Sequence, residues 1–232
     1  LKERLDIPVF HDDQHGTAMV VLAGLFNALK VAKKNIAMSR IVIAGAGAAG
    51  HAIADLLLLA GARDIVVLCS KGIRSKERND MDIPKKALLA ETNPRNISGG
   101  IDEALLGADV FIGVSKGNTV TRAQVASMAD NAIVFALANP IPEIMPDEAK
   151  KAGALVVATG RSDFPNQLNN VLGFPGIFRG ALDHGVRDIT NEMLVKAALK
   201  LARLIAKPTA NLIIPSPFDK RVVPAVANAI RE

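Results

Sequence analysis

The sequence predicts a doubly wound α/β fold, with helices on both faces of a mostly parallel sheet and a helical C-terminal tail. Apolar runs of strand length alternate with helix-like segments, as expected for parallel strands that are buried on both faces. A glycine-rich turn, GAGAAG at 45–50, separates the first such run from the segment that follows it. Of the 232 residues, 50% are hydrophobic, which is enough for a large core.

The first elements follow from local patterns in chain order. An extended segment at 7–10 leads into a helix at 15–33, where apolar residues recur at helical spacing before a basic pair. A strand at 40–44, a helix at 52–60 and a strand at 65–68 then form a βαβ unit. Because such crossovers are right-handed, we expect the two strands to be parallel.

The rest of the chain continues the alternation and then becomes helical. The charged stretch 72–82 lacks apolar periodicity, so we predict a surface loop there. Further strands are predicted at 110–112, 133–136 and 155–158, preceded by helices at 101–106, 121–128 and 146–151. The tail is predicted to carry helices at 191–206 and 222–231, separated by a Pro-rich turn.

The glycine turn has the context of a Rossmann-type dinucleotide-binding unit, because it lies between a predicted strand and a predicted helix. Gly45 allows the chain to turn out of the strand, Gly47 lets a pyrophosphate approach the main chain, and Gly50 lets the helix pack on the sheet. The unpaired N–H groups at the start of the helix then face the phosphates. The alternative is a purely structural glycine turn.

Polar residues cluster at further positions where ligands bind in such sheets. Ser115, Asn139 and the stretch 159–163 follow predicted strands, although turn chemistry alone accounts for each of them. The stretch 166–170 contains three Asn and one Gln, whose amides suit a hydroxy acid but equally suit helix capping. In the cluster His11-Asp12-Asp13-Gln14-His15, the carboxylates fit either Mg²⁺ or Mn²⁺ binding or a helix cap, and the spacing does not fit zinc.

Composition excludes other classes of protein. The net charge is +5, but the basic residues are scattered and the eight Phe are the only aromatic residues, so we expect no nucleic-acid partner. No uninterrupted apolar run approaches the length of a membrane span, and we expect no membrane partner. The single cysteine, Cys69, rules out an internal disulfide and fits a reducing, cytoplasmic location.

Three long motifs closely resemble the malic enzyme family in its bacterial-type branch. They are IPVFHDDQHGTA at 7–18, FALANPIPE at 135–143 and ATGRSDFPNQ at 158–167, which runs on to FPG at 174–176. The resemblance spans nearly the whole chain and implies oxidative decarboxylation of L-malate to pyruvate and CO₂. It also implies reduction of NADP or NAD, dependence on Mg²⁺ or Mn²⁺, and assembly as a homodimer or higher homo-oligomer.

The resemblance also assigns residues. Asp13 matches the metal-binding aspartate of the family, with Asp12 beside it as a second-shell neighbour. Malate and the nicotinamide side of the cofactor would meet Asn139, Asn169 and Asn170. The cofactor would further contact Gly45, Ala46, Gly47, Ala48, Ala49, Gly50 and Ser115.

The sequence departs from the family in two respects. The family's catalytic lysine and tyrosine and two further acidic ligands belong to a segment upstream of Leu1, and the chain contains no Tyr. We therefore expect no catalytic residue in this chain and no activity of the chain alone. It would be a nucleotide-binding domain with a lead-in at 1–34, a Rossmann core at 35–165 and a helical part at 166–232. At the end of the second strand, Ser70, Lys71 and Arg74 stand where the family usually has an aspartate. This change favours NADP over NAD, and the alternative is that the stretch is an ordinary basic loop.

Two other functions stay open at this point. An oxaloacetate decarboxylase of the same family would use the metal and the asparagines without a redox cofactor. A non-catalytic nucleotide-binding or sensor module would need neither metal nor malate, and residues Asp13, Asn139 and Asn170 argue against it.

Overall fold

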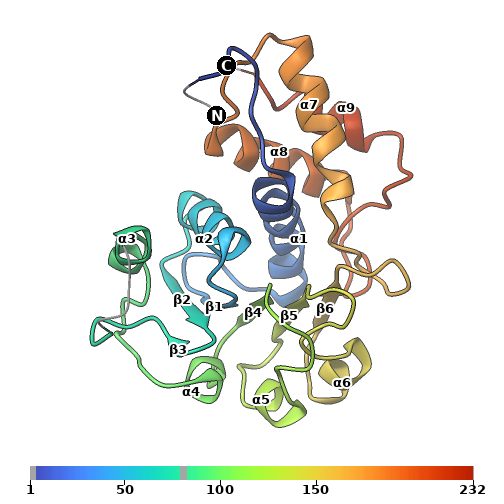
Figure 1. Cartoon of the computed structure of the whole chain (residues 1–232). Helices are drawn as coiled ribbons and strands as arrows, with labels where there is room; N and C mark the ends of the chain where they lie inside the picture. Colours follow the sequence, from blue (N-terminus) through green and yellow to red (C-terminus); the bar gives the residue numbers. More distant parts are fainter. Residues whose placement is uncertain (1–3, 79–82, 232) are drawn as a thin grey trace.

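A computed structural model describes residues 4–78 and 83–231 of the chain (Figure 1). Its strands are β1 (Arg40–Ala44), β2 (Asp64–Cys69), β3 (Gly72–Ile73), β4 (Val110–Gly113), β5 (Ile133–Ala136) and β6 (Val156–Thr159). They form one sheet in the order β3-β2-β1-β4-β5-β6. Every pairing is parallel except that of β3 with β2, so the predicted fold class is confirmed.

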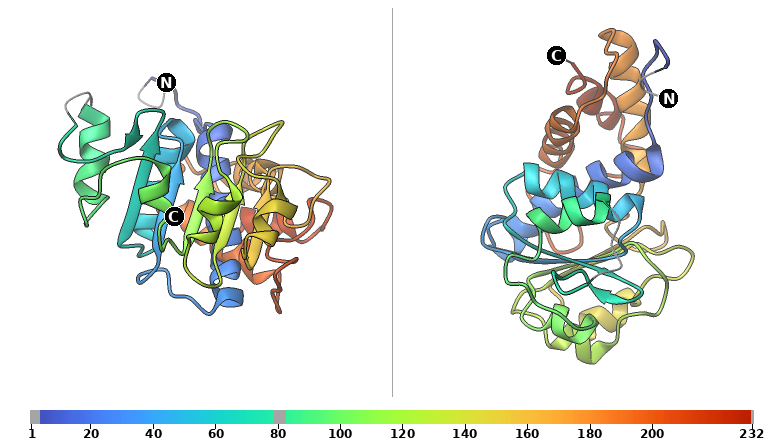
Figure 2. Two further views of the ribbon diagram at one scale, coloured as in Figure 1. Left: turned by 90° about the horizontal axis from the view of Figure 1, so that it is seen from below. Right: turned by 60° about the vertical axis from the view of Figure 1, so that its left-hand side comes forward.

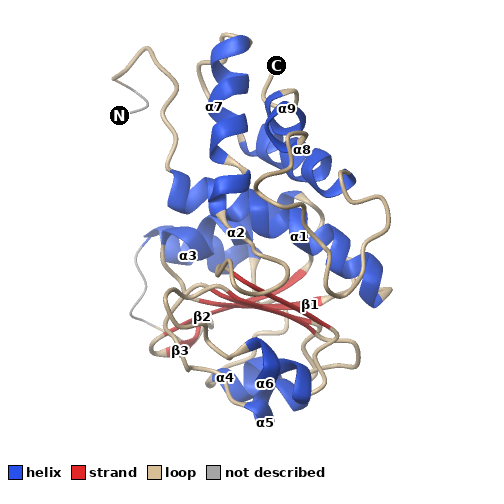
Figure 3. Ribbon diagram, turned by 90° about the vertical axis from the view of Figure 1, so that its right-hand side faces the viewer, coloured by secondary structure: helices blue, strands red, loops and turns tan. Residues whose placement is uncertain are grey.

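The helices cover both faces of this sheet. They are η1 (Asp12–Gly16), α1 (Thr17–Ala32), α2 (Ala48–Leu59), α3 (Ile83–Glu91), α4 (Ile101–Leu105), α5 (Arg122–Ala126), α6 (Pro146–Lys151), η2 (Asn170–Leu172), α7 (Phe174–Asp183), α8 (Asn191–Arg203) and α9 (Val222–Ala227). Helices α1 and α2 lie on one face and α4, α5 and α6 on the other, while α7, α8 and α9 stack beyond α1 (Figures 1 and 3). Two buried clusters follow, one on each face of the sheet.

Alternate residues along each strand enter opposite clusters. Ile41 and Ile43 of β1 pack with α1 and α2, whereas Val42 packs toward α4. This period of two is the geometry of a strand, and it explains why both neighbours had to be apolar. The strands are therefore buried from both sides.

Helix α1 is the central support of the fold. The stretch Asp12–Ala32 is long and apolar enough by composition to cross a membrane, yet 72% of its most apolar window is buried inside the protein. Asn27 at its middle is fully buried, and its Nδ2 donates to Ala202 O at 2.8 Å and to Ile213 O at 2.9 Å. The apolar surface of α1 is thus used in the core, where it joins the sheet to the helical tail (Figure 2).

The predicted loop at 72–82 was wrong in part. Gly72–Ile73 forms the short edge strand β3, which pairs with Leu68 and Cys69. The last residues of the predicted loop, 79–82, lie outside the described residues. Helix α3 was also missed because its sequence, IPKKALLAE, has only a short apolar stripe. The predicted helix at 52–60 begins four residues earlier, at Ala48, because the alanines of the turn already belong to it.

Candidate functional site

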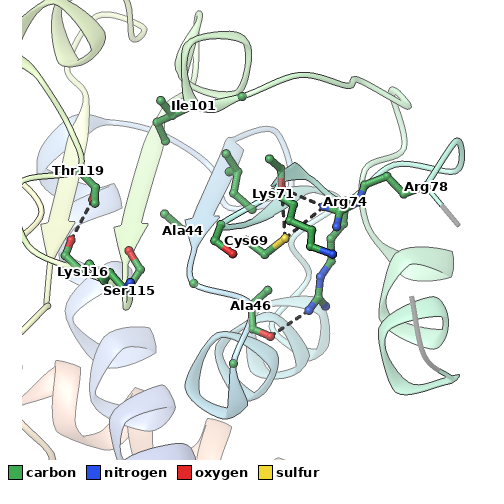
Figure 4. Close-up of a pocket in the computed structure, with 16 residues that line it drawn as sticks. Ala44, Ala46, Cys69, Lys71, Arg74, Arg78, Ile101, Ser115, Lys116 and Thr119 are labelled. Carbon is green, nitrogen blue, oxygen red and sulfur yellow. Dashed lines mark hydrogen bonds between the residues drawn. The ribbon is translucent and has the colours of Figure 1, made fainter. Parts of the chain in front are cut away.

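A cavity of about 640 Å³ lies at the carboxyl ends of β1, β2 and β4. Its walls are the turn after β1, the connection between β2 and β3, the start of α4 and the loop after β4 (Figure 4). Strands β2 and β4 flank β1 on its two sides, so the order in which successive strands are added to the sheet reverses at this point. Ligands of open α/β sheets bind at this kind of crevice.

The glycine turn has the close contacts that its sequence predicts. Gly45 adopts φ 126°, and a Cβ on it would lie 2.4 Å from Val114 O. A Cβ on Gly50 would lie 1.8 Å from Gly45 O, whereas one on Gly47 would meet nothing within 4 Å. Gly47 is the N-cap of α2, so the free N–H groups of that helix begin at the cavity.

The structure brings together most, not all, of the residues predicted to bind the cofactor. The cavity is lined by Gly45, Ala46, Gly47, Ser70, Lys71, Arg74 and Ser115. Ala48, Ala49 and Gly50 form the first turn of α2, and Asn139, exposed after β5, is outside the lining. The roles of these residues stay predictions.

The basic connection after β2 separates into exposed and buried side chains. Ser70 and Lys71 are exposed beside the cavity. Arg74 is only 3% exposed, and its Nη2 donates to Ala46 O at 2.9 Å, so this guanidinium binds the glycine turn. The sequence reasoning missed Arg78, which lines the same cavity; the only available signal was its place in the charged stretch after Arg74.

Cys69 lies at the end of β2 with its thiol inside this basic wall. Arg78 Nη1 donates to its Sγ at 3.1 Å. Partial burial acts to raise the pKa of the thiol, but the hydrogen bond from Arg78, a main-chain hydrogen bond from Lys71 and the positive charges of Arg78 and Arg74 together lower it, so the pKa of Cys69 lies below its ordinary value. A lower pKa increases the fraction of thiolate at a given pH.

Glu143 is a second residue that the sequence reasoning missed. Its carboxylate is fully buried and accepts hydrogen bonds from Ser115 N at 2.9 Å and from Ala138 N at 3.0 Å. Burial raises the pKa of Glu143, while these hydrogen bonds act against the shift. This carboxylate ties the loop after β4 to the loop after β5, where the Asn139–Pro140 peptide bond is cis.

The two carboxylates of η1 meet Asn170 from the far end of the sequence. Asn170 Nδ2 donates to Asp12 Oδ2 at 2.5 Å and to Asp13 Oδ1 at 3.5 Å. Burial and the charge of Asp13 raise the pKa of Asp12, and its Oδ1 is buried without a hydrogen-bond partner. Asn169 instead caps η2, with its Oδ1 accepting from Val171 N at 3.0 Å, as the capping alternative predicts.

An unpartnered carboxylate oxygen beside a second carboxylate fits a hard divalent cation. No side chain caps η1, so helix capping does not explain the pair. Within residues 4–78 and 83–231, however, no group of three or more His, Cys, Asp or Glu side chains gathers to hold a metal ion. The described residues can supply part of a metal site, and oxygen ligands from elsewhere would have to complete it.

Comparison with known proteins decides the family. Residues 14–229 match the family described as "Malic enzyme, NAD binding domain". The chain belongs to the malic enzyme family. The sequence resemblance is therefore confirmed.

Relatives in the malic enzyme family match the chain along its whole length. It is 52% identical to the bifunctional malic/malolactic enzyme of Bacillus subtilis, over 99% of this chain and 57% of that protein. It is 48% identical to the NAD-dependent malic enzyme of Geobacillus stearothermophilus, over 100% of this chain and 49% of that protein. The crystal structure of malic enzyme from Pyrococcus horikoshii superposes with a TM-score of 0.94 at 48% identity, covering 99% of this chain and 55% of that one. The chain thus spans about half the length of the relatives it matches.

Proposed function

We propose that this chain forms the nucleotide-binding part of an enzyme that oxidatively decarboxylates L-malate to pyruvate and CO₂, with transfer of a hydride to NADP or NAD. The observation that carries the proposal is the cavity at the switch point of the sheet, with the glycine turn and the start of α2 on its wall. The family and the names of its relatives support the reaction.

The chain's own residues would bind and orient the reactants. The N–H groups at the start of α2 would hold the pyrophosphate, and Asn139 and Asn170 would contact malate and the nicotinamide. Asp13, with Asp12 beside it, would contribute to a Mg²⁺ or Mn²⁺ site; the bound cation supplies Lewis-acid polarisation of the substrate oxygens. The buried Oδ1 of Asp12 and the contact of Asn170 with both carboxylates support this placement.

We infer that NADP is the preferred nucleotide. Residues 70–76, directly after β2, contain no carboxylate that would repel a 2′-phosphate, and Ser70, Lys71 and Arg78 border the cavity there. We assign the 2′-phosphate contact to Arg78, whose Nη1 also donates to Cys69 Sγ, in place of Arg74, because Nη1 and Nη2 of Arg74 contact His51 and the glycine turn. Isothermal titration of the protein with NADP and with NAD tests this, and tighter binding of NAD would refute it.

The proposed reaction is tested by malate-dependent formation of NADPH or NADH with Mn²⁺ present. We expect the full-length protein to be active and the 232-residue chain to be inactive, because the chain has no Tyr to act as the family's proton donor. Turnover by the isolated chain would show that the chemistry has been misplaced. Pyruvate formed from oxaloacetate without any nucleotide, in the absence of malate oxidation, would favour the decarboxylase alternative.

We further propose a cytoplasmic homodimer or larger homo-oligomer. The free thiol of Cys69 supports a reducing compartment. Light scattering coupled to size-exclusion chromatography of the full-length protein tests the assembly, and a monomer at micromolar concentration would contradict it.

A further inference from the structure

The side chain of Arg74 crosses from the edge of the sheet to the main chain of the glycine turn. Its own main chain is held in place, because its N–H donates to Val67 O at 2.9 Å and its carbonyl accepts from Asn93 Nδ2 at 3.0 Å. From this base, Nη2 reaches Ala46 O at 2.9 Å (Figure 4). Nη1 lies 3.2 Å from His51 Nε2. Arg74 therefore lines the cavity with its guanidinium bonded to the main chain of the glycine turn.

His51 extends the same contact to the next peptide of the turn. Its Nδ1 lies 3.0 Å from Gly47 O, and its Nε2 faces Arg74. A guanidinium only donates hydrogen bonds, so Nε2 must accept, and the proton of the neutral ring is on Nδ1, where it donates to Gly47 O. Arg74 holds the carbonyl of Ala46, and the His51 ring adds a second donor to Gly47 O, which also accepts the main-chain N–H of His51 at 3.0 Å.

These two carbonyls belong to the peptides that orient the N–H groups facing the cavity. If the carbonyls are turned back toward Arg74 and His51, the N–H groups on the other side of the turn stay available for an anion. The buried guanidinium also adds positive charge near the N-terminal end of α2. Both effects act on a pyrophosphate, and neither involves the 2′ position of the ribose.

We propose that Arg74 is a positioning residue of the nucleotide site, which holds the glycine turn at Ala46 and Gly47 in the conformation that receives the pyrophosphate of NAD and NADP alike. This inference rests on the proposal that the turn binds a dinucleotide. The proposal gives the two arginines of the cavity wall different roles. Arg74 would support the binding of both nucleotides equally, whereas Arg78 would contact only the 2′-phosphate.

The test compares Arg74→Met with Arg78→Met by isothermal titration with NAD and NADP. A hydrogen bond to a charged group contributes about one to two powers of ten to a binding constant. We therefore expect Arg74→Met to weaken the binding of both nucleotides by the same factor, roughly 10- to 100-fold. Arg78→Met should weaken NADP more than NAD, so that the preference for NADP falls. Loss of NADP binding alone in Arg74→Met, or unchanged binding of both nucleotides, would overturn the inference.

Two further measurements separate positioning from general loss of structure. Nitrogen NMR of His51 reports which ring nitrogen carries the proton, and Arg74→Met should release Nε2 from its acceptor role and change that signal. His51→Phe, a milder change on the surface of α2, should weaken both nucleotides less than Arg74→Met, and the double variant should lose less than the two single losses combined. Strictly additive losses would show that Arg74 and His51 do not act together on the glycine turn.

The result is distinguishable from failure of the proposed cofactor preference. If the unchanged protein prefers NAD, the NADP proposal fails, while an equal loss of affinity for both nucleotides in Arg74→Met still supports the positioning role of Arg74. If the unchanged protein binds neither nucleotide, the proposed function and this inference both fall.

Discussion

Gly47 and Gly50 belong to the same glycine turn but differ in what a methyl group would meet there. A Cβ on Gly50 would lie 1.8 Å from Gly45 O and 3.6 Å from Ile43 Cγ2, both in rigid surroundings. A Cβ on Gly47 would meet nothing within 4 Å, and Gly47 has an ordinary φ of −83°. Gly50→Ala and Gly47→Ala therefore form a matched pair, one of which disturbs packing while the other enters the binding space.

The magnitudes follow from these contacts. An ordinary carbon–oxygen contact is about 3.3–3.6 Å, so Gly50→Ala must move the turn by roughly 1.5 Å. We expect the free energy of unfolding to fall by about 1–3 kcal/mol from overpacking, and nucleotide affinity to fall by on the order of 100-fold from the displaced turn. Gly47→Ala should change the free energy of unfolding by less than about 1 kcal/mol, because the stiffer unfolded chain offsets the poorer N-cap.

Gly47→Ala should nevertheless weaken nucleotide binding about 10- to 100-fold, since the new methyl occupies the space through which a pyrophosphate reaches the main chain. Urea unfolding followed by circular dichroism measures the stability of both variants. Titration with NADPH, read by its own fluorescence, measures binding without a background from the chain, which has no Trp or Tyr. Unchanged NADPH affinity in Gly47→Ala, or unchanged stability in Gly50→Ala, would refute the reasoning.

Further predictions concern the core and the basic wall of the cavity. Asn27→Leu should lower the free energy of unfolding, measured in urea, by about 2–4 kcal/mol, because it removes the buried side-chain donor of Ala202 O and Ile213 O, and exposed Asn228→Leu is the control. Since the pKa of the Cys69 thiol is lowered, iodoacetamide should alkylate it at a lower pH than free cysteine, and Arg78→Met should shift that pH profile upward. Saturating NADP should slow the alkylation if Cys69 borders the bound nucleotide, and mass spectrometry follows all three rates.

Much of the fold could be predicted because the local signals are strong. Each parallel strand is a short run of β-branched and other apolar residues, and the spacing of helix α1 is regular over four turns. The edge strand β3 could not be predicted, since two residues, Gly72 and Ile73, become a strand only by pairing with β2. Helix α3 was not predicted for a related reason. Its own sequence pattern is weak, and its apolar residues form a stripe only through the packing of the helix.

The candidate site shows the same division. The glycine turn could be predicted from GAGAAG, because its backbone requirements depend on residues that are neighbours in sequence. The contact of Asp12 with Asn170 joins residues that are 158 positions apart, and no local pattern contains it. Arg74 was interpreted from the sequence as a phosphate ligand, yet its direction depends on how β2 and α2 pack, and that packing turns it toward Ala46.

By itself, the sequence determined the parallel strands and most of the helices in chain order, the glycine turn and the family, because hydrophobic period, glycine spacing and motif identity are local properties of the chain. Only the tertiary structure decided how far each charged group of the cavity wall is buried and to which part of the chain it is bonded. The physical reason is that hydrogen bonds and burial depend on the distances between elements, so Arg74 and Arg78, four residues apart, acquire different surroundings from the packing around them.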